Sequence, residues 1–528
     1  MMRLGILVDE RQAYFKWQYR LLQEISQYEH IALQVVINHH TLEHLKSMVD
    51  LIMMLQEWIE SQMLAIKTNH LVGKITDSKN LKTIPHIKLD QRDSPPILDA
   101  AIARIRTFEL DLIVDFTCRP IRDLPSTLAK RGIWSIQHGT SPYQISKWAG
   151  LLDMINRQPI TPIKLIEVEP AGRANLIDES FHFVHWSLAQ NKTQLIEQAS
   201  ILLDKHLRRE TNAASQRAIA FPLERAIGPS FTHMIHYLIY FYRSLAAKAY
   251  RKVATKYWGK RYRCWSLLVG KGALVSTDPH TAQSIIPPPG EFWADPFLFE
   301  DAKGVYLFFE NFNLQNKIGK ISCTEVKGSV IGEVQDVLVK DFHLSYPFLC
   351  VEDGSIFMIP ETSANRRLEI YRCVEMPNRW ELFTTAFEGE PIADASYFED
   401  DAGKRWLFVN KGVDDFFNDQ LHIYQIDSLS LKTITPHRQN PVIIDARRAR
   451  NAGPIFRSGS QFIRPSQNNS YGTYGYGLNL NVIKKLSLDH YEEEVVHKVT
   501  PESHIRFKSC HHLHQTKDRF VMDAITDD

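Results

Sequence analysis

The chain has few cysteines and almost no net charge. Its six cysteines form no C-x-x-C pair in 528 residues, which fits reduced thiols better than a disulfide framework. The 62 Lys and Arg side chains balance 61 Asp and Glu, so the formal net charge is +1 and no global field attracts a polyanion. We therefore expect a reducing compartment and no nucleic-acid partner.

A long apolar run is also missing. Met1 to Val8 are followed by the charged Asp9, Glu10 and Arg11, so the start lacks the apolar core of a signal peptide. The nearest candidate for a membrane span, residues 231–242, is short and contains two histidines. The expected location is the cytoplasm, and no segment is expected to cross a bilayer.

The N-terminal part lacks a dinucleotide fingerprint but alternates between strands and helices. No G-x-G-x-x-G follows the first apolar run, which argues against a dehydrogenase. Apolar patterning predicts strands at 4–8, 32–37, 111–116 and 132–137 and helices at 14–28, 41–63 and 97–108. Such alternation builds a parallel sheet with its site at the carboxyl ends of the strands. We predict an α/β domain over residues 1–210.

Residues 211–261 read as a helical, basic linker. Residues 231–245 are aromatic and apolar, and a basic cluster extends from Lys248 to Arg263. An apolar face followed by cations suits a peripheral contact of residues 231–263 with anionic lipid. The default interpretation is a connecting helix between two domains.

From Tyr262 onward the chain repeats itself. Residues 296–310 align with 347–361, each an apolar strand, a polar turn with Gly, a second apolar strand and a carboxylate. Three weaker copies start at 395, 454 and 511. Copies spaced by about fifty to sixty residues are typical of propeller blades. The sequence therefore predicts an all-β five-bladed propeller over residues 262–528.

Equivalent positions of the copies should converge on the central channel. The copies open with Asp295, Tyr346, Asp394, Gly453 and His511 and close with Glu310, Glu361, Asn410, Gln467 and Asp523. Carboxylates that share a cleft can supply acid/base or nucleophilic chemistry at a glycosidic centre. We predict Asp295, Glu361 and Asp394 as catalytic residues. The alternative is that these polar groups satisfy backbone groups at the ends of the blades.

Further residues are predicted to bind the substrate. A guanidinium fork grips carboxylate or phosphate, so Arg450 and Arg464 would suit an acidic sugar, a sugar phosphate or a nucleotide diphosphate. The alternative pairs each arginine with an Asp or Glu of a neighbouring blade. Alternate residues of a strand share a face, so His512 and His514 point together, and two imidazoles do not make a metal site. The remaining predicted contacts are Glu310, Tyr346 and Gln467.

Motifs of the repeat region carry a family resemblance. Phe292-Trp-Ala-Asp295-Pro-Phe297, His343-Leu-Ser-Tyr346-Pro347, Pro360-Glu361, Arg450-Asn-Ala-Gly453 and Arg464-Pro-Ser-Gln467 resemble the N-terminal propeller of glucosamine inositolphosphorylceramide transferases. That domain is similar to the five-bladed propellers of glycoside hydrolase family 43, which implies Asp295 as the general base. Where the resemblance would place the acid, the chain reads Asn451-Ala-Gly453-Pro454, which argues against ordinary glycoside hydrolysis.

A second resemblance concerns residues 1–210. Asp111 to Phe116, followed by Arg131 to Gly139, is similar to the core of folate-dependent formyltransferases. Ser135 stands at the Asn of that family's Asn-x-His motif, Gln137 stands at the His with His138 beside it, and Pro170-Ala-Gly172 replaces Asp-x-Gly. Formyl transfer needs a base, and Gln137 cannot serve as one. A degenerate domain kept for scaffolding or binding is expected.

Together these features predict an enzyme of glycoconjugate or surface-polysaccharide assembly. Its propeller would bind a sugar, sugar phosphate or nucleotide sugar in the channel, and no cofactor is firmly indicated. One alternative is a sugar N-formyltransferase that uses formyl-tetrahydrofolate and carries an accessory carbohydrate-binding propeller. A second alternative is a non-catalytic carbohydrate-binding scaffold.

Overall fold

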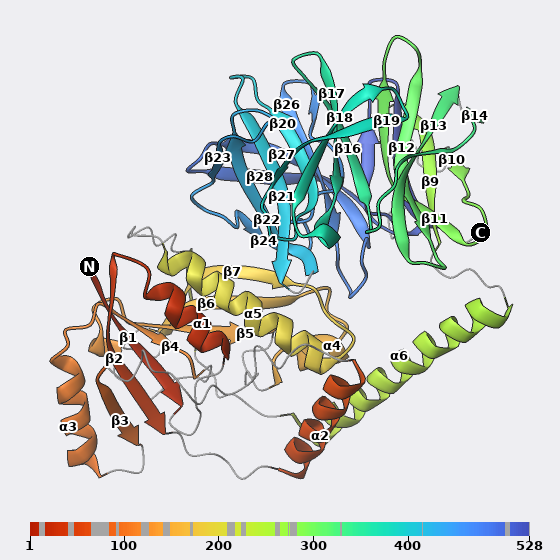
Figure 1. Cartoon of the computed structure of the whole chain (residues 1–528). Coiled ribbons are helices and arrows are strands. Elements are labelled where there is room, and N and C mark those ends of the chain that lie inside the picture. Colours follow the sequence, from red (N-terminus) through yellow and green to blue (C-terminus); the bar gives the residue numbers. More distant parts are fainter. Residues whose placement is uncertain are drawn as a thin grey trace. The chain divides into compact units, whose positions relative to one another are not determined.

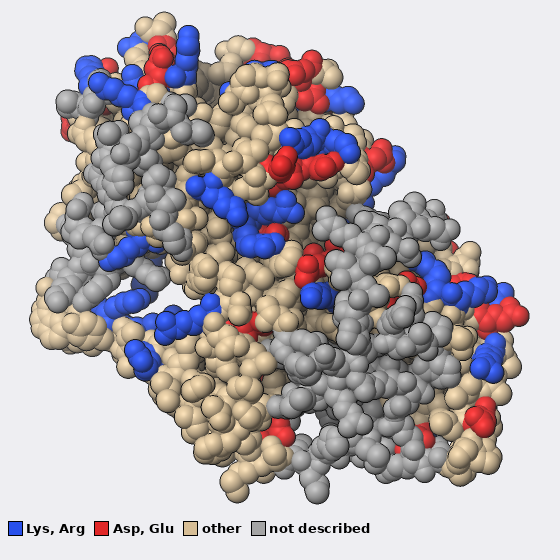
Figure 2. Space-filling view, turned by 180° about the vertical axis from the view of Figure 1, so that it is seen from behind, with Lys and Arg blue, Asp and Glu red and all other residues tan. Residues whose placement is uncertain are grey.

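The chain folds as two compact units, residues Met1–Ala249 and Tyr250–Asp528 (Figure 1). Lys and Arg side chains are interspersed with Asp and Glu over much of the surface in Figure 2, in keeping with the net charge of +1. The computed structural model describes residues 1–9, 16–40, 47–64, 84–90, 94–117, 126–140, 148–168, 173–208, 217–222, 229–258, 264–272, 274, 282–327, 330–413, 416–501 and 507–526.

The first unit is built on one eight-stranded sheet, in the order β3-β2-β1-β4-β5-β6-β7-β8. Neighbours from β3 to β5 run parallel, and neighbours from β5 to β8 run antiparallel. The strands are β1 (Met2–Asp9), β2 (Ile31–His40), β3 (His86–Asp90), β4 (Leu112–Asp115), β5 (Ile133–His138), β6 (Thr161–Val168), β7 (Arg173–His182) and β8 (Arg217–Pro222). The four predicted strands are confirmed as β1, β2, β4 and β5. The likeness to formyltransferases stays a prediction.

Helices alternate with these strands. They are α1 (Lys16–Ile25), α2 (Met48–Met63), α3 (Pro95–Arg106), α4 (Leu151–Ile155), α5 (Leu188–Leu207) and α6 (Phe231–Trp258), with a 3₁₀ turn η3 (Ser126–Leu128). A capping box starts α2, because Ser47 accepts from the amide of Asp50 and Asp50 accepts from the amide of Ser47. All four residues of β4 are buried, as expected for a parallel strand covered on both faces.

The segment predicted as a linker is largely part of the first unit. Residues 217–222 form β8, and the first half of α6 packs in a core with Met53 and Trp148 through Tyr237 and Phe241. The boundary between the two units lies inside α6, at Ala249. Among the described helices, none has the length and apolar character needed to cross a bilayer.

The second unit consists of five antiparallel sheets, which we number as blades one to five. Blade one contains β11 (Glu291–Glu300), β12 (Val305–Asn313), β13 (Ile318–Lys327), β14 (Val330–Ile331) and β15 (Gln335–Leu338). Blade two contains β16 (Ser345–Glu352), β17 (Ser355–Glu361), β18 (Leu368–Glu375) and β19 (Arg379–Ala386), with a 3₁₀ turn η7 (Ser363–Asn365). Blade three contains β20 (Ala393–Glu399), β21 (Arg405–Val413), β22 (Phe416–Ile426), β23 (Ile434–Pro436) and β24 (Ile443–Ile444).

Blades four and five complete the predicted all-β five-bladed propeller. Blade four contains β25 (Phe456–Ser458), β26 (Gln461–Asn468), β27 (Gly477–Leu486) and β28 (Tyr491–Val499). Blade five contains β9 (Trp265–Lys271), β10 (Gln283–Ile285), β29 (Phe507–Ser509), β30 (Leu513–Gln515) and β31 (Arg519–Thr526). Because β9 pairs with β31, the first and last strands of the unit share one sheet, which closes the ring of blades.

Candidate functional site

The first strand of several blades carries the same backbone irregularity. The pairing register shifts between Ala294 and Phe297 in β11, and equivalent shifts occur in β16 and β20. The residues inside these shifts, Asp295, Tyr346 and Asp394, have φ values of 50°, 46° and 46°. Left-handed backbone is costly for residues with a Cβ and gathers at functional sites. These three repeat positions, aligned from the sequence, are therefore equivalent in the structure. At each of them the irregular backbone orients one polar side chain.

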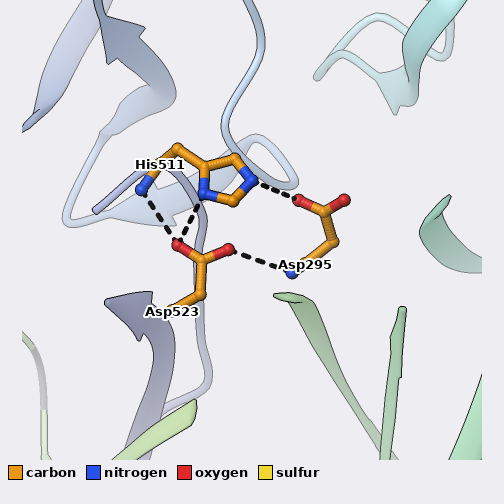
Figure 3. Close-up of side chains that lie close together, drawn as sticks. All are labelled: Asp295, His511 and Asp523. Carbon is orange, nitrogen blue, oxygen red and sulfur yellow. Dashed lines mark hydrogen bonds and ion pairs between the residues drawn. The ribbon is translucent and has the colours of Figure 1, made fainter. Parts of the chain in front are cut away.

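Three buried groups, from blades one and five, form a hydrogen-bonded triad (Figure 3). His511 Nε2 lies 3.3 Å from Asp295 Oδ1, and His511 Nδ1 lies 3.1 Å from Asp523 Oδ1. The amide of Asp295 donates to Asp523 Oδ2 at 3.0 Å. Burial opposes a charge on the imidazole, but Asp523 and Asp295 outweigh it and raise the pKa of His511 to about 10. Two carboxylates thus share one imidazolium.

The triad keeps Asp295 ionised. Burial by itself raises the pKa of that carboxyl, but its hydrogen bond to His511 and the nearby imidazoles lower the pKa below its ordinary value. The amide of Tyr346 also donates to Asp295 Oδ2, at 3.2 Å. An ionised carboxylate held in this way can accept a proton from a bound hydroxyl.

The pKa of Glu310 is shifted in the opposite direction to that of Asp295. Glu310 lies on β12, where it pairs with Ala294, the neighbour of Asp295, and its side chain is buried. Burial, followed by the charge of Asp295, raises the pKa of Glu310 well above the ordinary value. The only ion-pair partner among the described residues is His343, whose Nε2 lies 3.5 Å from Glu310 Oε1. The channel therefore places a carboxyl that favours its proton beside one that does not.

Arg450 joins the carboxylates of blades two and three. Its Nε donates to Asp394 Oδ2 at 2.6 Å, and its Nη2 lies 3.6 Å from Glu361 Oε2. The guanidinium also lies over the ring of Tyr474, 5.1 Å from its centre. Burial raises the pKa of Asp394 to about 8, while Arg450 acts in the opposite direction. Arg450 is thus the main counter-charge of this group.

These residues act on one another electrostatically. Asp295 and Glu361 both contribute to the raised pKa of Asp394, and both also raise that of Glu310. The structure therefore brings five of the ten predicted catalytic and substrate-binding residues, together with His511 and Asp523, into one group, which we call the channel cluster: Asp295, Glu310, Glu361, Asp394, Arg450, His511 and Asp523.

Two predicted contact residues support the cluster from within the core. The hydroxyl of Tyr346 contacts Ser396 Oγ at 2.8 Å and accepts from the amide of Gly453 at 3.0 Å. The ring of His512 packs against Phe297 and Tyr346, and burial lowers the pKa of His512 to about 3. His512 is therefore a neutral wall of the site, although its Nδ1 lies 3.5 Å from Asp295.

Arg464, Gln467 and His514 lie outside the channel cluster. Arg464 is fully buried and forms a two-pronged ion pair with Glu493, at 2.7 and 2.8 Å, so it pairs with a carboxylate of its own blade and not with one of a neighbouring blade. Gln467 donates to the carbonyl of Asn451 at 3.2 Å. His514 Nδ1 accepts from the amide of Leu298 at 3.0 Å. These three side chains stabilise backbone or strand packing, and the structure does not bring them to the predicted ligand.

Of His511, His512 and His514, only His511 belongs to a group of described residues that could hold a metal ion. Asp295, His511 and Asp523 offer donor atoms within 4.8 Å of one another. Both nitrogens of His511 already face carboxylates, and a metal would have to displace its proton. The contacts of His511 with both carboxylates fit a protonated imidazole, whose pKa is raised to about 10.

The predicted site in the N-terminal sheet contains no charged base among its described residues. Ser135 Oγ donates to Asp115 Oδ2 at 2.8 Å, and Gln137 lies on β5 opposite Lys164. Burial lowers the pKa of His138 to about 4, so the imidazole is neutral. Pro170-Ala-Gly172, the third departure from the formyltransferase pattern, lies outside the described residues.

Some members of the site were missed by sequence reasoning. His511 and Asp523 occupied equivalent repeat positions, but nothing in the sequence indicated that they share a proton. Tyr474 lies in a loop of blade four, in the stretch Tyr471-Gly-Thr-Tyr-Gly-Tyr-Gly477, outside the aligned repeats. The density of tyrosine and glycine in that loop was the available signal.

The repeat region matches a known family model. Residues 277–516 match "Glucosamine inositolphosphorylceramide transferase 1, N-terminal". Two curated proteins named glucosamine inositolphosphorylceramide transferase 1 are 32% identical, one from Oryza sativa subsp. japonica over 213 residues and one from Arabidopsis thaliana over 212. Each alignment covers 39% of this chain.

The similarity to solved structures is weaker than the similarity to these two proteins. The β-xylosidase/α-arabinofuranosidase CoXyl43 of glycoside hydrolase family 43, from a compost metagenome, matches with a TM-score of 0.30 and 13% identity, over 44% of this chain and 91% of its own. RS223-β-xylosidase matches with a TM-score of 0.32 and 11% identity, over 45% and 92%. The chain spans only 28% and 27% of the length of the rice and Arabidopsis proteins that it matches.

Proposed function

We propose that the protein is a transferase of glycoconjugate assembly that binds a sugar, a sugar phosphate or a nucleotide sugar at the channel cluster. The observation that carries the proposal is the pair Asp295 and Glu310, one held ionised by His511 and the other held protonated by burial. Enzymes that act at an anomeric carbon usually use two carboxyl groups with different pKa values, one protonated and one ionised. The names of the matched relatives support a glycoconjugate as substrate class.

We propose a sugar-transfer step that uses both carboxyl groups. The hydroxyl of an acceptor attacks the anomeric carbon of the bound sugar, and Asp295 accepts the hydroxyl proton. The bond between the anomeric carbon and the leaving oxygen breaks, and Glu310 gives its proton to that oxygen. His511 and Asp523 do not touch the reacting atoms in this scheme, since they hold Asp295 in place and in its ionised form.

Arg450 is proposed to set the preference for anionic ligands. Its guanidinium is shared between Asp394 and Glu361, with the longer contact, 3.6 Å, to Glu361. A phosphate could replace the weaker contact and use the same fork. A neutral sugar would instead use the carboxylates as hydrogen-bond acceptors. Binding of a phosphorylated sugar should therefore depend on Arg450 more than binding of the neutral sugar does.

A binding screen on the full chain tests the proposal. Ligand-observed NMR with neutral sugars, sugar phosphates and nucleotide sugars should find at least one ligand. Glu310→Gln and Arg450→Lys should each weaken it by tenfold or more. Asp445→Asn is the matched control, because Asp445 is equally buried but pairs with Arg447 and Arg448 away from the cluster. Binding that is unaffected by both cluster variants would contradict a channel site.

We propose that the N-terminal unit binds or scaffolds and does not transfer formyl groups. Gln137 has no basic atom, and His138 is buried and neutral, which support this proposal. A formyltransferase-like origin of residues 1–210 and a cytoplasmic location remain parts of the same proposal.

A further inference from the structure

Helix α2 exposes an almost uncharged apolar face. Its buried side carries Met53, Gln56 and Glu60. Its outward side exposes seven large apolar side chains and no charged one: Met48, Leu51, Ile52, Met54, Leu55, Trp58 and Met63. Leu55 is 57% exposed and Trp58 is 60% exposed. Scattered exposed apolar residues are ordinary, but a continuous helix face of this kind marks an interaction site.

The neighbouring helix α6 carries a second apolar stripe. Phe231, Ile235, Ile239 and Tyr242 follow one another at spacings of four, four and three, which places them on one face, and all four are exposed. The two helices are joined on their inner sides, where Tyr237 donates to Glu60 Oε1 at 2.5 Å. The hydroxyl of Tyr242 reaches Gln56 Oε1 at 3.1 Å. We call the exposed residues of α2 and of this stripe the two-helix platform.

The exposed charged side chains of the two helices belong to α6 and are cationic, whereas the charged side chains of α2 are acidic and not exposed. Helix α6 contains five Lys or Arg and no Asp or Glu in its 28 residues. The acidic side chains of α2 are engaged: Asp50 in the helix cap, Glu57 with Lys192, and Glu60 with Tyr237. In Figure 2 the part of the surface formed by these helices, at the lower left, is mostly tan, with blue side chains along its upper border.

We propose that the two-helix platform docks the protein on the surface of an anionic lipid bilayer. Amphipathic helices with Lys or Arg beside an apolar face lie in the headgroup region, and Trp and Tyr favour that depth. None of the described helices is able to cross a membrane, which agrees with docking on the surface. A second copy of the chain is the weaker partner, because two platforms face to face would bring their cationic helices together. This inference does not rest on the proposed transferase activity.

Co-sedimentation of the full chain with vesicles tests the apolar part of the platform. The wild type should bind phosphatidylcholine vesicles that contain about one third phosphatidylglycerol. Leu55→Glu and Trp58→Glu should each weaken binding at least tenfold, because each puts a charge into the buried lipid contact. Leu382→Glu is the matched control, since Leu382 is 49% exposed on the outer strand β19 of the propeller. Circular dichroism should show unchanged folding, because all three positions are exposed.

A second pair of variants tests the charge. Reversing Arg243 and Lys248, the exposed cations of α6 within the first unit, to Glu should weaken binding to the anionic vesicles by about 25-fold or more, at roughly fivefold per cation. Lys404 and Lys498, exposed in the propeller, reversed together to Glu are the matched control and should have little effect. Pure phosphatidylcholine vesicles should bind the wild type much more weakly than the anionic ones.

Several outcomes would overturn the proposal. One is a wild type that does not sediment with anionic vesicles. Another is sedimentation that Leu55→Glu and Leu382→Glu affect equally. A third is a dimer, seen by analytical ultracentrifugation without lipid, that Leu55→Glu dissociates while vesicle binding is absent; this would assign the platform to a second copy of the chain.

Discussion

The pKa of a buried histidine is lowered in the N-terminal unit and can be raised in the propeller. In the N-terminal unit, burial lowers the pKa of His138 to about 4 and that of His185 to about 3, so both are neutral. In the propeller, His511 is equally buried, yet its pKa is raised to about 10. The difference lies in the neighbours, because His511 has a carboxylate at each ring nitrogen. The adjacent His512, without that pair, is neutral, with a pKa of about 3.

This difference fits the proposed roles of the N-terminal unit as a scaffold and of the channel cluster as a ligand site. Burial alone removes charge, and a protein interior that only needs stability has no reason to keep it. The channel cluster instead keeps Asp295, His511 and Arg450 charged and pairs each of them. Such arrangements are costly to form and concentrate where chemistry is done.

Replacing Asp295 by Asn should have the largest effect. Turnover of the ligand found in the binding screen should fall by a factor of about 100 or more, because a positioned base contributes about 10² to 10⁴. The melting temperature should fall modestly, since the ionised Asp295 is paired with His511 in the folded protein. Differential scanning fluorimetry beside the kinetic assay measures both, with Asp445→Asn as control. A loss of stability with unchanged binding of every saccharide would make Asp295 a structural blade-end residue.

Arg464 should behave as a purely structural charge. Arg464→Met leaves Glu493 buried without its partner, which should cost about 3 to 5 kcal/mol of unfolding free energy. Adding Glu493→Leu removes the orphaned charge and should restore most of the stability. Urea denaturation measures this cycle, and ligand affinity of the double variant should equal that of the wild type. If the stable double variant loses affinity for the ligand, Arg464 contributes to ligand binding and is not purely structural.

The raised pKa of His511 predicts a pH dependence of stability. The folded protein holds this proton more tightly than the unfolded chain does, so the contribution is complete below a pH of about 6.5 and is lost as the pH rises toward about 10. Asp394 has a raised pKa of about 8, so its contribution to stability also falls as the pH rises, but only up to a pH of about 8. Between pH 8 and 10 the stability difference between the wild type and His511→Gln should therefore shrink. A difference that stays constant over this range would mean that His511 is not charged.

The smallest expected effect is in the N-terminal unit. We expect no formyl transfer from formyl-tetrahydrofolate to amino sugars, because Gln137 is no base and burial lowers the pKa of His138 to about 4, which makes it a weak base. Mass spectrometry of the amino sugar measures the product directly. Measurable transfer that disappears in His138→Ala would remove the contrast between the two units and favour the N-formyltransferase alternative.

Local patterns in the sequence predicted the elements and the repeat. Apolar strands such as β1 and β4 and the paired runs 296–310 and 347–361 follow from periodicity, because strand and helix faces are set by neighbours in the chain. The same alignment placed Asp295, Tyr346 and Asp394 at equivalent positions, and their shared positive φ confirms the equivalence. The end of the first unit was predicted too early, since β8 pairs with β7 and part of α6 packs on distant residues such as Met53.

Which charge pairs with which was decided by the tertiary structure alone. Arg450 and Arg464 lie in similar polar segments, yet one reaches Asp394 in another blade and the other reaches Glu493 in its own. Glu310 and Asp295 are both buried carboxyl groups of blade one, and the position of His511, more than 200 residues away, keeps Asp295 ionised, whereas burial and the charge of Asp295 keep the proton on Glu310. The sequence determines residue types and strand periodicity, whereas protonation depends on distances across a closed ring of blades that no local pattern records.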